Sequence, residues 1–98
     1  MTETTTPILD APNILSHVSL GTDDMPAALA FYDQVMPTIG AKRVYDAPDH
    51  AVAYGKQFPE FWVHPPHNQQ PTSVGNGTHI AFLAWSQAQV HAFYDAAI

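Results

Sequence analysis

Apolar and polar residues alternate along Ile14–Leu20, and this two-residue period predicts a strand that ends at Gly21. A helix is expected next, because Asp23 or Asp24 can accept hydrogen bonds from its first amides and Pro26 suits its first turn. Helical spacing is shown by the apolar residues Met25, Ala28, Leu29, Tyr32, Val35 and Met36, and the pattern ends at Pro37 and Gly40.

Three short apolar segments follow, at residues 41–47, 51–55 and 60–64, with turn-forming residues between them. They predict an antiparallel meander. Residues 65–78 contain three prolines and two glycines without periodicity, which is typical of a linker.

The chain contains an internal repeat. Residues 17–36 align without a gap on residues 79–98, at an offset of 62 residues from His17 to His79, and the tetrapeptide AFYD recurs whole. A duplicated unit is the best interpretation. It predicts a strand over His79–Trp85 and then a second helix, capped by Ser86. The aromatic residues of both AFYD copies are expected in the core: Phe31, Tyr32, Phe93 and Tyr94. Val90 and Ala97 lie on the same apolar stripe of the second helix.

The repeat divides the chain into an N-terminal tail at residues 1–13, a first βαβββ module at 14–64, the linker at 65–78 and the start of a second module at 79–98. The predicted fold class is α+β. Since the second copy stops within its helix, we expect either a piece of a longer protein, which is the favoured alternative, or a short chain that is completed by pairing with another copy.

Charge and composition exclude some classes of partner and site. With three Lys and Arg residues against nine Asp and Glu, the formal charge of −6 disfavours nucleic acid and membrane surfaces as partners. The chain contains no Cys, no long apolar run and no signal-like start, so we expect a cytoplasmic protein without disulfides.

Four features of the sequence occur together: a strand that begins with histidine, a helix start of Gly-Thr-Asp-Asp-Met, an AFYD helix, and a second strand that begins with histidine. In these features the chain resembles the vicinal oxygen chelate superfamily, which contains glyoxalases, bleomycin-resistance proteins and extradiol dioxygenases. The resemblance covers residues 14–98. It implies a glyoxalase-like cup of antiparallel and mixed strands whose metal ligands lie on the first and last strands of each module.

By this resemblance, His17 and His79 occupy first-strand ligand positions for one divalent ion, Zn, Ni, Mn or Fe, for which neutral imidazole is a good ligand. The last strand of the first module departs from the pattern, because Phe61 or Trp62 stands where a Glu or His is expected. A substrate pocket is expected to involve Trp62, His64, Tyr54 and Trp85.

Three functions stay open. The first is a metal-dependent lyase, isomerase or dioxygenase resembling lactoylglutathione lyase. The second is a metal-free protein that binds or sequesters a small molecule, resembling bleomycin-resistance proteins and needing no cofactor. The third is an inactive module that dimerises through an open sheet edge, and a homodimer is the expected assembly.

Overall fold

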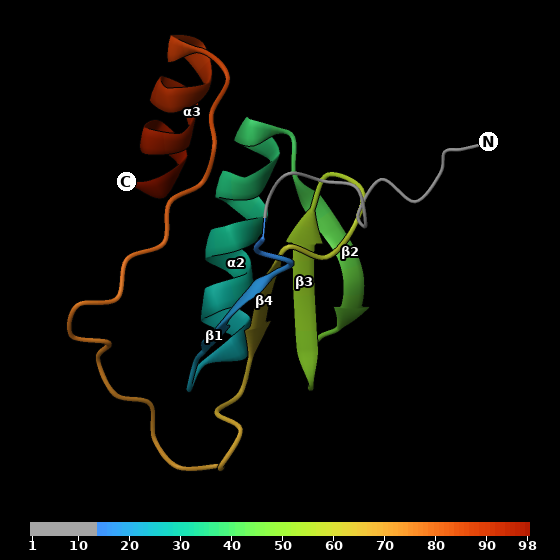
Figure 1. The fold of residues 1–98 in the computed structure, drawn as a ribbon, viewed down its shortest axis with the longest axis vertical. Coiled ribbons are helices and arrows are strands. Elements are labelled where there is room, and N and C mark those ends of the chain that lie inside the picture. The colour runs from blue at the N-terminus through green and yellow to red at the C-terminus, as the bar shows by residue number, and fades with distance from the viewer. Residues whose placement is uncertain (1–13) are drawn as a thin grey trace.

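Four strands form one mixed sheet in the order β1-β4-β3-β2 (Figure 1). The computed structural model describes residues 14–98, so the N-terminal tail predicted at residues 1–13 lies outside the described residues. Antiparallel pairing joins β2 to β3 and β3 to β4, which confirms the predicted meander, whereas β1 pairs with β4 in parallel. The strands are β1 Val18–Gly21, β2 Lys42–Ala47, β3 Ala51–Gly55 and β4 Phe61–His64.

The crossover between β1 and the meander is the helix α2, Met25–Val35, extended by the 3-10 turn η1, Met36–Ile39. Of the two predicted caps, Asp24 is the one used, and it accepts a 3.0 Å hydrogen bond from the amide of Ala27. The helix stops at Gly40, whose φ of 84° lies in the left-handed region that glycine adopts without strain.

Helix α2 and η1 pack against one face of the sheet, and the core lies between them (Figure 1). Strand β4 displays the alternation clearly, since Phe61 and Val63 are buried on the helix side while Trp62 and His64 are only half-buried on the other side. The buried apolar residues are Leu29, Val35, Met36, Ile39, Ala41, Val52, Ala53, Tyr54, Phe61 and Val63. The chain is therefore an α+β protein in which helices cover one face of the sheet, and no helix within residues 14–98 covers the other.

The first strand is shorter than predicted. It begins at Val18 instead of Ile14, so His17 lies just before the strand, and Leu20 is 37% exposed. Alternation predicted which residues share a face, but the ladder starts only where β4 offers a partner, at Phe61.

The strand predicted at His79–Trp85 is absent, and this part of the prediction was wrong. The segment is extended, and within residues 14–98 it has no strand beside it. Its alternation is present all the same, because Phe82 and Ala84 pack against the core while Leu83 and Trp85 are largely exposed. Apolar alternation fixes side-chain directions, but a strand also needs hydrogen-bonding neighbours.

The second helix, α3, spans Gln87–Ala97, and Ser86 caps it as predicted by accepting a 3.1 Å hydrogen bond from the amide of Gln89. It lies beside α2 and η1 and not over the sheet (Figure 1). None of the helices within residues 14–98 is long and apolar enough to cross a membrane.

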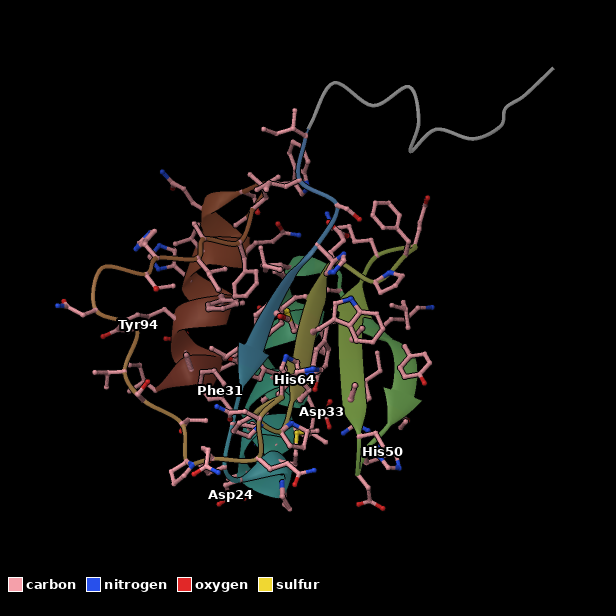
Figure 2. The ribbon with its side chains drawn as sticks, turned by 60° about the horizontal axis from the view of Figure 1, so that its bottom comes forward. Asp24, Phe31, Asp33, His50, His64 and Tyr94 are labelled. Carbon is pink, nitrogen blue, oxygen red and sulfur yellow. The ribbon has the colours of Figure 1, made fainter. Side chains whose placement is uncertain are left out.

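The AFYD aromatics do not all enter the core. Tyr32 and Phe93 pack against it as expected, but Phe31 is 41% exposed and Tyr94 is 63% exposed (Figure 2). Val90, on the predicted stripe of α3, is also exposed. The reason is that α3 packs on a helix whereas α2 packs on a sheet, so the same tetrapeptide buries different positions in its two copies.

Candidate functional site

A cavity of about 500 Å³ lies between the extended segment 79–85 and the end of the sheet where β1 and β4 begin and β3 ends. Its size is that of a site for a small organic molecule. The lining residues are Leu15, Ser16, His17, Val18, Met36, Ile39, Ala41, Tyr54, Gly55, Lys56, Glu60, Phe61, His79, Ile80, Ala81, Phe82, Leu83 and Trp85.

The floor of the cavity is apolar and rigid. Met36, Ile39, Tyr54 and Phe61 line it, and each is at most 6% exposed. These side chains come from η1, β3 and β4, so regular secondary structure fixes their positions.

Phe82 anchors the segment that forms the outer wall. Its ring lies edge-on to Phe61, with centroids 5.0 Å apart, and its centroid is 6.1 Å from that of Phe93 on α3. Phe61 in turn contacts Tyr32 of α2 at 5.0 Å. A continuous aromatic cluster therefore holds the segment 79–85 against the first module although no strand pairing does so.

Four titratable side chains among the other lining residues give the cavity a polar and more exposed side. His17, Lys56, Glu60 and His79 are exposed, and Trp85 is 73% exposed. The ammonium group of Lys56 lies 5.4 Å from the centroid of the Trp85 ring, within the range of a cation–π contact. An apolar floor with a few polar groups at one side is the usual construction of a small-molecule site.

The turn between β3 and β4 positions Lys56 and Glu60. The amide of Glu60 donates a 3.0 Å hydrogen bond to the carbonyl oxygen of Tyr54, which closes the turn. Gly55 is required there, because a Cβ atom at this position would clash with the carbonyl oxygen of Phe58. Both charged side chains are thus carried by a tightly folded loop at the cavity.

Trp62 lies outside this cavity, on the open sheet face, which no helix of the described residues covers. Its ring centroid is 5.3 Å from that of Tyr45 and 6.3 Å from that of His17. Its neighbours in the ladder are the small residues Ser19 and Ala53, which leave the indole room on the sheet. This aromatic row meets the cavity at His17, which belongs to both.

His64 lies at the far end of β4 from the cavity (Figure 2). Its Nδ1 atom is 2.6 Å from the carbonyl oxygen of Pro65, a distance at which a protonated Nδ1 donates to that oxygen. This contact and the register, which places His64 beside Gly21, keep it apart from the cavity.

A polar cluster on the helix side of the sheet joins α2 to β2 and β3. Arg43 donates to both carboxylate oxygens of Asp33, at 2.9 and 2.7 Å, and Tyr54 donates to Asp33 at 2.8 Å. The Arg43 hydrogen bond lowers the pKa of Asp33, against the smaller opposing effect of burial, and the Tyr54 hydrogen bond lowers it further. Burial and the neighbouring carboxylate raise the pKa of Tyr54, so its hydroxyl is held in the protonated, donating form.

The predicted metal ligands do not make a metal centre by themselves. His17 and His79 line the same cavity, but within residues 14–98 no three His, Cys, Asp or Glu side chains gather in a way that could hold an ion. On β4, the residue that pairs with Ser19 and faces the open side of the sheet is Trp62. Its indole N–H is only a hydrogen-bond donor, so it cannot bind a metal ion as a carboxylate would. The donor set of the described residues therefore does not fit a resident divalent ion.

Four of the six residues singled out from the sequence meet at the cavity: His17, His79, Tyr54 and Trp85. Tyr54 contributes only to the floor, because its hydroxyl is bound to Asp33. Trp62 and His64 lie on the open sheet face.

Three residues were given no role from the sequence: Lys56 and Glu60, which line the cavity, and Tyr45, which contacts Trp62 on the open sheet face. The signal for Lys56 was the scarcity of basic residues, because the chain has only three Lys and Arg residues and one of them lies in the turn Gly-Lys-Gln-Phe-Pro. The proximity of Tyr45 to Trp62 depends on a register irregularity between Arg43 and Tyr45, which no sequence pattern reveals.

Comparisons with known proteins agree on one family. The model of the Glyoxalase/Bleomycin resistance protein/Dioxygenase superfamily matches residues 14–97. A crystal structure of a glyoxalase/bleomycin resistance protein from Albidiferax ferrireducens T118 is similar to this chain with a TM-score of 0.76 and 31% identity, over 87% of this chain and 70% of that one. No curated protein sequence matches the chain.

Proposed function

This chain belongs to the glyoxalase, bleomycin resistance protein and dioxygenase superfamily, and from that premise we propose that it binds a small, largely apolar organic molecule in the cavity beside segment 79–85, without a resident metal ion. The observation that carries the proposal is the cavity itself, of about 500 Å³, with a buried apolar floor and a polar side. The name of the superfamily covers resistance proteins as well as glyoxalases and dioxygenases. Fold alone does not choose between them, so the choice rests on the site.

The shape of the floor favours a flat or compact ligand. Phe61 of the floor meets Phe82 of the outer wall edge to face, and Trp85 adds an exposed indole from the same segment as Phe82. Such surfaces contact a planar ring over a large area and lose little conformational freedom on binding.

The proposal is tested with 2-naphthylacetamide, a neutral planar probe, by isothermal titration calorimetry and by fluorescence of the two tryptophans. Ala81→Trp adds a bulky side chain at the cavity lining, and we expect it to weaken binding by about tenfold or more. Ala88→Trp places the same side chain on the exposed surface of α3, outside the cavity, and is expected to bind as the unmodified chain does. Equal weakening in both variants, or in neither, would locate the probe elsewhere and contradict the proposal.

A metal-dependent enzyme is the second candidate, and one observation favours it: His17 and His79, far apart in the sequence, line the same cavity. This candidate requires further ligands, of the carboxylate type, that the described residues do not bring to the two imidazoles. Elemental analysis of protein purified without chelator distinguishes the two candidates. One divalent ion per chain, lost in His17→Ala and in His79→Ala, would replace the binding proposal with the enzymatic one.

A further inference from the structure

The cation at the cavity is the starting point. The chain has three basic side chains, Lys42, Arg43 and Lys56, and only Lys56 lines the cavity. Arg43 is paired with Asp33 and Asp46 and does not line the cavity. In a chain with a formal charge of −6, the single positive side chain at the apolar cavity is the group that can select a ligand by its charge.

Two contacts place the outer end of the Lys56 side chain. Its Cε atom lies 3.6 Å from the place where a Cβ of Gly40 would stand, so the aliphatic part passes close to the end of η1. Its ammonium group lies 5.4 Å from the centroid of the Trp85 ring. The end of the side chain thus lies between η1 and segment 79–85, with its last carbon near η1 and its charge at the polar side of the cavity.

Glu60 is the carboxylate among the described lining residues, and it must be weighed against Lys56. One of its oxygens, Oε2, lies 3.4 Å from the position of a Cβ at Gly55, so this carboxylate folds back onto its own turn. The ammonium of Lys56 instead reaches the opposite wall of the cavity, at Trp85. The cation is therefore the better placed of the two charges to contact a bound molecule.

We propose that the cavity selects apolar molecules that carry one carboxylate, with the apolar body on the floor formed by Met36, Ile39 and Phe61 and the carboxylate at Lys56. This inference rests on the function proposed above and names its ligand class. The exposed nitrogen-bearing side chains of His17 and His79 line the same polar side and provide additional hydrogen-bond donors to the carboxylate.

The test compares 2-naphthylacetate with the isosteric 2-naphthylacetamide, by calorimetry at about pH 8, where an ordinary imidazole is uncharged. The unmodified chain is expected to bind the acetate about fivefold tighter than the amide, and added salt is expected to reduce that ratio. Lys56→Met keeps most of the stem and removes the charge, so the ratio should fall to about one, while Lys56→Arg should retain it. Lys42→Met is the matched control, since it removes the same charge from β2 outside the cavity and should leave the ratio unchanged.

The outcomes separate this inference from the proposed function. Binding of the amide and the acetate with equal affinity would overturn the role of Lys56 and leave the cavity as a binding site for neutral molecules. Tighter binding of 2-naphthylmethylammonium than of the acetate would show that Glu60 dominates, and would also overturn it. If neither naphthyl probe binds at millimolar concentration, the proposed function fails, and this inference fails with it. Circular dichroism of each variant shows whether its fold is retained.

Discussion

The hydroxyl of Tyr54 donates a 2.8 Å hydrogen bond to Oδ1 of Asp33, and through it β3 is tied to α2 across the core. Tyr54 is only 2% exposed, and its ring also forms part of the cavity floor. One side chain thus belongs both to the framework of the module and to the proposed binding site.

Tyr54→Phe is expected to lower the free energy of unfolding by about 1–2 kcal/mol, because the buried hydrogen bond to a carboxylate is lost while the ring remains. Chemical denaturation followed by circular dichroism measures the change. Tyr45→Phe is the control, since Tyr45 is 50% exposed and belongs to the open sheet face, and it should have little effect on stability. Equal effects of the two substitutions would contradict a special role for the bond to Asp33.

Stability should fall with acid in a way that depends on Asp33. Its pKa is lowered in the folded state, mainly by the hydrogen bond from Arg43, so the unfolded chain binds a proton at higher pH than the folded chain. The stabilisation is therefore present above the unfolded carboxyl pKa of about 4 and is lost as pH falls through the folded value. In Asp33→Asn this contribution is absent at every pH, so its stability should change less between neutral and acidic pH. Parallel curves for the two proteins would refute the coupling.

Gly55→Ala should destabilise the chain by about 2–3 kcal/mol, because the added Cβ meets the carbonyl oxygen of Phe58 and the turn must shift. The same shift moves Lys56 and Glu60, so probe binding should weaken as well. Gly21→Ala is the matched control, since its nearest contacts are 3.7 Å or more away and its backbone is unstrained. Thermal melting and calorimetry report the two effects.

The homodimer expected from the sequence stays a prediction, and we propose that segment 79–85, which pairs with no strand within residues 14–98, is the surface that forms it. The segment has no formally charged residue and no proline, and Leu83 and Trp85 are 74% and 73% exposed, so it lacks the features that usually prevent edge pairing. Sedimentation velocity should show a dimer that grows with concentration, and Leu83→Lys should restore a monomer. Ala88→Lys introduces the same charge on α3 and should leave the dimer intact. A monomer at every concentration would remove the homodimer from consideration.

Much of the first module could be predicted because its signals are local. The cap at Asp24, the end of the helix at Gly40 and the three strands of the meander each depend on residues within a few positions of one another. The strand predicted at residues 60–64 is likewise present, as β4. Local propensity and periodicity agreed with the tertiary structure at these points.

The second segment could not be predicted in the same way. The repeat predicted α3 and its cap at Ser86 correctly. However, α2 is buried against the sheet, whereas α3 packs against α2 and η1. Tyr94 and Val90 are exposed for that reason. The cavity could not be predicted from the sequence, because Lys56 meets Trp85 only through the path of the linker. Asp23 fixes this path by accepting hydrogen bonds from both the amide and the hydroxyl of Thr72.

The parallel pairing of β1 with β4 has a consequence for how the sheet assembles. Short turns join β2, β3 and β4, so these strands can pair early, whereas β1 must wait until α2 has formed and the meander offers its free edge. The amides of Val18 and Thr22 donate to Glu60 and His64 across this last junction. In pulsed hydrogen exchange during refolding, they should gain protection after the amides of β3, so His17 reaches the cavity only in the final stage of folding.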